Sequence, residues 1–416
     1  MRMDRLLVAA AVVLSGTASV QLPAQKFVPP PVQSSDLTLR LEPAGRMAAG
    51  RNATSPVAAG SSLLLVDQGG EIFRWSGREI VRILGAADVP TGLKLVGHER
   101  IQNVAAAPAG ATVYVMFISS SVPANVPRRQ SPRDPDAWSV LYEFAFDGQR
   151  LTSSRAVTAL QIRTDGHTGG GLAVLPDGSV LFASGDNGDS YEDGREYSQD
   201  PGVHLSKLVR IDPRTGEASV MARGVRAAQR LVVTGAGPDA RVSFVDPGGW
   251  VAEELNSFLL RDEFSSQTPI NFGWGRAADG RAREGAFYLD KLGNSTGVIT
   301  GIEREFRAPV ASFGRESATF VAVSGPIVGA ASFKRITALF GDLVGGQVLG
   351  VTGPMADTNQ PVFRVSLVDE RGDAVTLQAL AEGKRPDPRF FTFPDGSAGV
   401  LLEATGQFYR LIETVK

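Results

Sequence analysis

His167 is the residue of this sequence best suited to chemistry, because it heads the run His167-Thr-Gly-Gly-Gly-Leu. An imidazole titrates near neutral pH, so it can take the proton from a hydroxyl group while hydride leaves the same carbon. The glycines beside it would let a flat cofactor approach the backbone. The other two histidines, His98 and His204, lie in less suggestive contexts. His167 is therefore the candidate base, and the alternative is a histidine that only caps a strand.

An acidic segment follows His167. It runs through Asp186-Asn-Gly-Asp189 and continues with Glu192-Asp193-Gly194. Clustered carboxylates suit Ca²⁺, but an EF-hand loop needs an oxygen ligand where Tyr191 stands. We therefore predict a turn here, with a cation site as the alternative.

Short strands are expected to position these residues. Apolar runs of strand length, rich in β-branched and aromatic residues, recur along the chain and are broken by Gly, Asp, Asn and Pro. They include residues 62–67, 71–75, 112–118, 139–146, 179–184, 347–351 and 407–412. Long helical periodicity is nearly absent. The polar segment 119–136, with Arg128-Arg129, is expected to be a surface loop.

A weak internal repeat organises these strands. The segments that begin at Pro108, Pro176 and Pro394 share one order, in which a tight turn (Pro-Asp-Gly in the last two) precedes an apolar run. Residues 36–416 divide into six such units of roughly 60 residues, a length found in propeller repeats. We predict an all-β fold, a six-bladed β-propeller. Two β-sandwiches are the alternative, although no linker interrupts the middle of the chain.

Composition and the N-terminal residues limit the function classes. The net charge is −2 with both signs mixed along the chain, which gives no electrostatic case for nucleic acid or an anionic membrane. Arg2 and Arg5 precede an apolar stretch, residues 6–14, that is too short to span a bilayer. We predict a signal peptide at 1–24, a Pro-rich spacer at 25–35 and an exported, periplasmic protein with no membrane span after cleavage. The alternative is an uncleaved N-terminal anchor.

An ordered set of motifs resembles one known family. The segment from His167 to Asp212 is the most specific match, and the other matches lie before and after it in the expected order. They are Asp67-Gln-Gly-Gly-Glu-Ile, Glu99-Arg100 with 104–108, Gly224-Val-Arg226-Ala-Ala-Gln229, Glu253-Glu254-Leu-Asn256 with Asn271-Phe-Gly-Trp274, Gly341-Asp-Leu-Val-Gly-Gly-Gln-Val, and Pro394-Asp-Gly with Gln407-Phe-Tyr-Arg. Together they resemble the glucose/sorbosone dehydrogenase family, six-bladed propellers that often use pyrroloquinoline quinone (PQQ).

The resemblance implies roles for particular residues. His167 matches the catalytic base, and Arg226 matches an arginine beside the quinone and the substrate. Arg385 and Arg389 match, with some displacement, the cations that precede the last Pro-Asp-Gly and hold the cofactor. For calcium, the carbonyls of Gly248 and Gly249 match ligands of an ion that bridges quinone and protein. Glu254 and the carbonyl of Phe272 match ligands of a structural ion.

The chain also departs from the family pattern. Ala227 stands where the family has an asparagine, Val344 replaces a lysine, and Gly166 replaces a carboxylate, with Asp165 one residue further back. The function that the resemblance implies is PQQ- and calcium-dependent oxidation of an aldose or related alcohol by hydride transfer, with an electron acceptor that the sequence does not name. The main alternative is a non-catalytic propeller that binds a glycan or a protein at the same face. A calcium-dependent lactone hydrolase is a third.

Overall fold

Short β-strands form nearly all of the regular structure, which confirms the all-β prediction. The computed structural model of the chain describes residues 29–47, 53–132, 134–164, 166–188, 195–249, 251–265, 268–276, 280–290, 294–299, 305–314 and 323–414. The expected signal peptide 1–24, residues 25–28 of the spacer, Asp165 and residues 189–194 of the acidic segment lie outside these ranges. The α-helices within them are α1 (Arg195–Ser198), α2 (Leu260–Ser265) and α3 (Leu377–Leu380), with 3-10 turns at Ala86–Asp88 and Gly237–Asp239.

The described strands form six sheets of four to six strands and one sheet of three. In spatial order the first sheet contains β2 (Val57–Ala59), β3 (Ser62–Asp67), β4 (Glu71–Trp75) and β5 (Ile80–Leu84); the second β6 (Ile101–Ala106), β7 (Thr112–Ser119), β9 (Ala137–Phe146), β10 (Leu151–Ile162) and β8 (Arg128–Arg129); the third β11 (Gly169–Val174), β12 (Val180–Ser184), β13 (Lys207–Ile211), β14 (Ala218–Arg223) and β18 (Ile270–Asn271). The fourth contains β15 (Leu231–Thr234), β16 (Arg241–Asp246), β17 (Ala252–Leu259) and β22 (Ala311–Gly314); the fifth β23 (Val323–Val328), β24 (Ala338–Asp342), β25 (Val348–Val351) and β26 (Phe363–Arg364); the sixth β29 (Pro388–Thr392), β30 (Ala398–Leu402), β31 (Gln407–Thr414), β1 (Thr38–Arg46), β27 (Ser366–Val368) and β28 (Ala374–Val375). The small sheet contains β19 (Ala282–Glu284), β20 (Phe287–Leu289) and β21 (Ser295–Val298).

The repeated turn motif produces the same turn three times. Gly110, Gly178 and Gly396 all have positive φ, and each donates its backbone N–H to the carbonyl three residues earlier. In the two Pro-Asp-Gly copies, the carboxylates of Asp177 and Asp395 also accept the N–H two residues later, as Asx turns do. The turns join β6 to β7, β11 to β12, and β29 to β30, so in each case the motif ends the first strand of a sheet.

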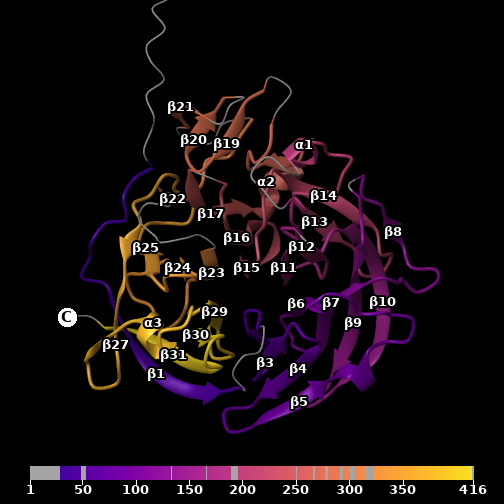
Figure 1. The fold of residues 1–416 in the computed structure, drawn as a ribbon, viewed down its shortest axis with the longest axis horizontal. Helices are drawn as coiled ribbons and strands as arrows, with labels where there is room; N and C mark the ends of the chain where they lie inside the picture. The colour runs from indigo at the N-terminus through magenta and orange to yellow at the C-terminus, as the bar shows by residue number, and fades with distance from the viewer. Residues whose placement is uncertain are drawn as a thin grey trace, which may run out of the picture.

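The six larger sheets are arranged around a common centre, and the small sheet lies at the outer edge (Figure 1). Their first strands β2, β6, β11, β15, β23 and β29 contact one another in that order, and β29 also contacts β2. Buried apolar clusters fill the space between each sheet and the next, including the sixth and the first. The core is thus distributed between neighbouring sheets, and it does not divide into two sandwiches.

The first and last strands of the described chain pair with each other in the sixth sheet. β1 pairs with β31 antiparallel, with Thr38 opposite Thr414. No helix in the described ranges is long and apolar enough to cross a membrane.

Candidate active site

His167 and Arg226 are in direct contact near the centre of the ring of sheets. His167 immediately precedes β11, and Arg226 follows β14. Arg226 Nη2 lies 3.0 Å from His167 Nε2, and the other ring nitrogen, Nδ1, lies 3.0 Å from Asp186 Oδ1. A guanidinium can only donate, and an ionised carboxylate can only accept. The imidazole is therefore neutral with its proton on Nδ1, and Nε2 is the basic nitrogen.

The glycines around His167 let two segments of backbone approach closely. A Cβ on Gly185 would lie 1.8 Å from the His167 carbonyl oxygen, and one on Gly169, which has a φ of +74°, would lie 2.4 Å from the Ala183 carbonyl oxygen. The sequence suggested that the glycines beside His167 admit a flat cofactor. Gly169 and Gly185 instead bring the segments at β11 and β12 together, and this close approach sets Asp186 beside His167. Gly170 faces Gln102, and Gly171 lies against Leu231 and Ala183.

Asp186 is the main residue that sequence reasoning missed, since the acidic segment was interpreted as a turn. Its side chain is fully buried after β12. Besides His167, its carboxylate accepts the indole Nε1–H of Trp274 at 2.9 Å and the backbone N–H of Gly188 at 3.0 Å. A carboxylate held in this way fixes both the orientation and the tautomer of the imidazole.

Arg226 is held by both its backbone and its side chain. Its guanidinium carbon lies 5.3 Å from the centre of the Trp274 ring, and Nη1 donates to the Pro247 carbonyl at 3.3 Å. Its backbone N–H donates to Asp246, which also accepts the N–H of Ala227. Burial, and next the charge of Glu254, raise the pKa of Asp246 to about 7. The arginine thus lies in a fixed position over the base.

These side chains open onto a cavity of about 590 Å³. Two further arginines line it, Arg230 and Arg389, whereas Glu99 is the one acidic residue among the lining residues. Arg389 was predicted from the sequence, and it also pairs with Glu403 at 2.9 Å. Arg385 does not line the cavity, because its exposed side chain pairs with Asp387 at 2.8 Å. Sequence reasoning did not single out Arg230.

The residues implied in calcium binding come together only in part. Glu254 and the carbonyl of Phe272 do converge, but both bind the side chain of Arg283, at 2.7 and 2.5 Å. These residues therefore do not fit a metal ion while the guanidinium lies between them. Gly248 packs closely on the backbone of Ala252. Within the described ranges, no group of three or more His, Asp or Glu side chains could hold a metal ion.

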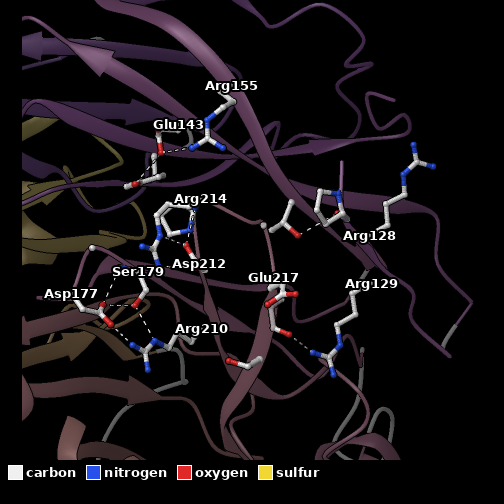
Figure 2. Close-up of a pocket in the computed structure, with 18 residues that line it drawn as sticks. Arg128, Arg129, Glu143, Arg155, Asp177, Ser179, Arg210, Asp212, Arg214 and Glu217 are labelled. Atoms are coloured by element: carbon white, nitrogen blue, oxygen red, sulfur yellow. Dashed lines mark hydrogen bonds and ion pairs between the residues drawn. The ribbon is translucent and has the colours of Figure 1, made fainter. Parts of the chain in front are cut away.

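A larger cavity, of about 1140 Å³, lies between the second and third sheets (Figure 2), and His167 is not among the residues that line it. It is lined by charged side chains, most of which bind one another. The pairs are Arg155 with Glu143, Arg210 with Asp177, and Arg214 with Asp212. Arg129 donates to the carbonyls of Ala218 and Gly202. Because these charges are largely paired and no predicted site residue lines this cavity, the cavity at His167 is the candidate site.

Comparison with known proteins supports the fold. No protein-family model matches this chain, and no curated protein matches it. Among solved structures it is similar to the PQQ-bound form of an aldose sugar dehydrogenase from Streptomyces coelicolor, with a TM-score of 0.59 and 17% identity over 93% of this chain and 100% of that one. It is also similar to an oxidoreductase described as a glucose dehydrogenase from Thermus thermophilus, with a TM-score of 0.57 and 16% identity over 90% and 100%. The resemblance inferred from the sequence is thus confirmed at the level of the fold.

The cavity has a donor set that fits a tricarboxylate such as PQQ. Three guanidinium groups line it, from Arg226, Arg230 and Arg389. The Nε atoms of Arg226 and Arg389 are buried, and neither has a hydrogen-bond partner among the described residues. Arg230 donates Nε–H to the Pro326 carbonyl at 3.1 Å, and it pairs with no carboxylate in the described part of the chain. Arg230 thus offers a cation in a cavity where Ala227 lacks the amide of the family pattern.

Proposed function

We propose that the six larger sheets are the blades of a single β-propeller over residues 36–416, and that the chain is a dehydrogenase-like oxidoreductase. Its substrate is an aldose sugar or a related alcohol, and its cofactor is PQQ. The observation that carries the proposal is that His167 contacts both Asp186 and Arg226 at the wall of a cavity that two further arginines also line. Calcium belongs to the proposal only at the Gly248–Gly249 loop, next to Pro247 on the cavity wall.

The mechanism assigns a separate task to each side chain. His167 Nε2 takes the proton of the substrate hydroxyl, and Asp186 stabilises the imidazolium that forms. Arg226 must first release Nε2, and its guanidinium then donates to an oxygen on which negative charge develops. Bound PQQ supplies an acceptor for the hydride that leaves the same carbon, so the substrate ends as a carbonyl compound. Arg230 and Arg389 bind carboxylates of the cofactor.

The test begins with binding. Purified protein without cofactor is titrated with PQQ in the presence of Ca²⁺, and dye reduction is then measured with a panel of aldoses. His167→Ala should lose roughly a hundredfold or more of the rate, the scale of general-base catalysis. His98→Ala is the matched control, because His98 lines the same cavity but touches neither Asp186 nor Arg226 in the described structure. Absence of PQQ binding in the micromolar range would count against the dehydrogenase.

The contact between Arg226 and His167 also favours a second candidate, a non-catalytic propeller that binds a glycan or a protein. In this structure the basic nitrogen of His167 is occupied by Arg226. The amides of Gln68 and Gln229 line the same cavity and could bind sugar hydroxyls. Binding of glycans without dye reduction, in protein that does not take up PQQ, would support this candidate over the first.

We also infer export to the periplasm through a cleaved signal peptide at residues 1–24, followed by the spacer 25–35. The charged start and short apolar stretch of the sequence support this inference. N-terminal sequencing of the mature protein tests it. A mature protein that still begins at residue 1 would contradict it.

A further inference from the structure

Arg283 is the most deeply buried arginine of the described chain, with 1% of its surface exposed. It lies in β19, the first strand of the small sheet. Its Nη2 donates to Glu254 in β17, Nε to the carbonyl of Phe272 after β18, and Nη1 to the carbonyl of Gly285 in the turn that follows β19, at 2.7, 2.5 and 2.5 Å. One guanidinium therefore ties together three segments of the chain.

The groups around this guanidinium are all oxygens. They are one carboxylate and two backbone carbonyls, and Asn256 lies beside them with Nδ2 on Glu254 at 2.7 Å. The Oδ1 of Asn256 is buried and has no hydrogen-bond partner among the described residues. Carboxylate, amide and carbonyl oxygens of this kind are what Ca²⁺ takes as ligands. These oxygens would thus suit a divalent metal ion, and here they surround the singly charged guanidinium of Arg283.

The backbone is shaped to admit the arginine. Gly273 has a φ of +88°, and a Cβ on it would lie 2.3 Å from the Cβ of Arg283. The backbone N–H of Arg283 donates to the Gly273 carbonyl at 2.9 Å. The next residue is Trp274, which donates to Asp186 at the candidate active site. Arg283 therefore supports the turn from which Trp274 reaches the base.

We propose that the guanidinium of Arg283 replaces a structural calcium ion, holding Glu254 and the Phe272 turn by a cation that the chain carries itself. A tethered cation is not lost to chelators or dilution, so the wild-type protein needs no calcium at this position. Removal of the guanidinium should leave an oxygen-lined site that a free Ca²⁺ can enter. The proposal goes beyond the oxidoreductase function and does not depend on it.

The experiment measures melting temperature at one scan rate for the full chain without PQQ, in EDTA and in Ca²⁺. Breaking a buried pair from one side is strongly destabilising, so Arg283→Ala in EDTA should melt about 4–6 °C lower than wild type. Ca²⁺ at about 100 times its Kd should restore about 3 °C in this variant. Arg283→Ala combined with Glu254→Gln should lose this gain, because the carboxylate ligand is gone. Arg307→Ala, which breaks the partly buried pair with Asp262, should show no calcium gain.

Three results would overturn the proposal, two with the variants above and one with a lysine variant. One is an Arg283→Ala protein whose melting temperature rises no more with Ca²⁺ than that of the wild type. The second is a rise in the melting temperature of the wild type with Ca²⁺ that the Glu254→Gln substitution abolishes, because the ion would then already bind at Glu254 in the wild type. Arg283→Lys keeps a positive charge and most of the volume, so it should fold and show no calcium gain. A calcium gain in this lysine variant equal to that of Arg283→Ala would also contradict the proposal.

Discussion

Replacing Trp274 by phenylalanine tests whether Asp186 is held as the structure indicates. The substitution keeps an aromatic ring but removes the indole N–H that lies 2.9 Å from Asp186 Oδ2. Asp186 is fully buried, so one oxygen of a buried carboxylate loses its partner. The ring also lies 5.3 Å from the Arg226 guanidinium carbon, and phenylalanine is a weaker cation–π partner than tryptophan.

The expected cost follows from these two contacts. A hydrogen bond to a charged group contributes about 1.5–3 kcal/mol, and the weaker cation–π contact adds about 0.5 kcal/mol. Trp274→Phe should therefore lower the free energy of unfolding by about 2–3.5 kcal/mol, measured by equilibrium unfolding in urea. Trp75→Phe is the control. Trp75 packs on Phe393 and Phe408, and its indole N–H has no hydrogen-bond partner in the described structure, so its loss should be about 1 kcal/mol or less.

A double-mutant cycle separates the hydrogen bond from the loss of ring volume. Trp274→Phe, Asp186→Asn and the double variant should give a coupling energy of about 1.5–3 kcal/mol between the two side chains. A coupling below about 0.5 kcal/mol would refute the reasoning. The same would follow if Trp274→Phe were no more destabilising than Trp75→Phe.

Two further outcomes are expected. Arg230→Gln should weaken PQQ binding about 10- to 100-fold in an absorbance titration, because a charge-assisted bond to a carboxylate is lost, whereas Arg385→Gln, outside the cavity, should not. Burial lowers the pKa of His204 to about 4. Between about pH 6.5 and 4 the imidazole is therefore protonated in the unfolded chain but not in the folded one. The free energy of unfolding should fall by about 3 kcal/mol as the pH drops through this window. His204→Gln should remove that part of the pH dependence; an unchanged acid slope in urea unfolding would contradict the assignment.

The fold was predictable because its signals are local. A Pro-Asp-Gly turn needs only a few neighbouring residues, and the positive φ of Gly178 and Gly396 follows from that short segment. Repetition of the turn then indicated the kind of architecture. The matching motifs assigned His167 and Arg226 to one site, but no local pattern predicts that two residues 59 positions apart are in direct contact.

The rest of the site depends on contacts that only the folded chain creates. Trp274 and Asp186 are 88 positions apart, and the partners of Arg283 come from three segments. The side chains of residues that are close in sequence can also point in different directions. Arg389 within β29 lines the cavity, whereas Arg385, just before that strand, turns outward to Asp387. The sequence alone does not show whether an arginine side chain binds a ligand, a neighbouring side chain or the backbone.

The pairing of β1 with β31 has a consequence for the order of folding. Thr38 and Thr414 are opposite each other although 376 positions separate them, so the sixth sheet cannot be completed until the last strand has been synthesised. Until then the arc of sheets has two open edges, and closing so long a loop is slow. The paired ends also make the chain a natural subject for circular permutation. A short linker from residue 414 to residue 38, with new termini at the exposed Asp147-Gly148 turn, would turn the most distant contact of the fold into a local one.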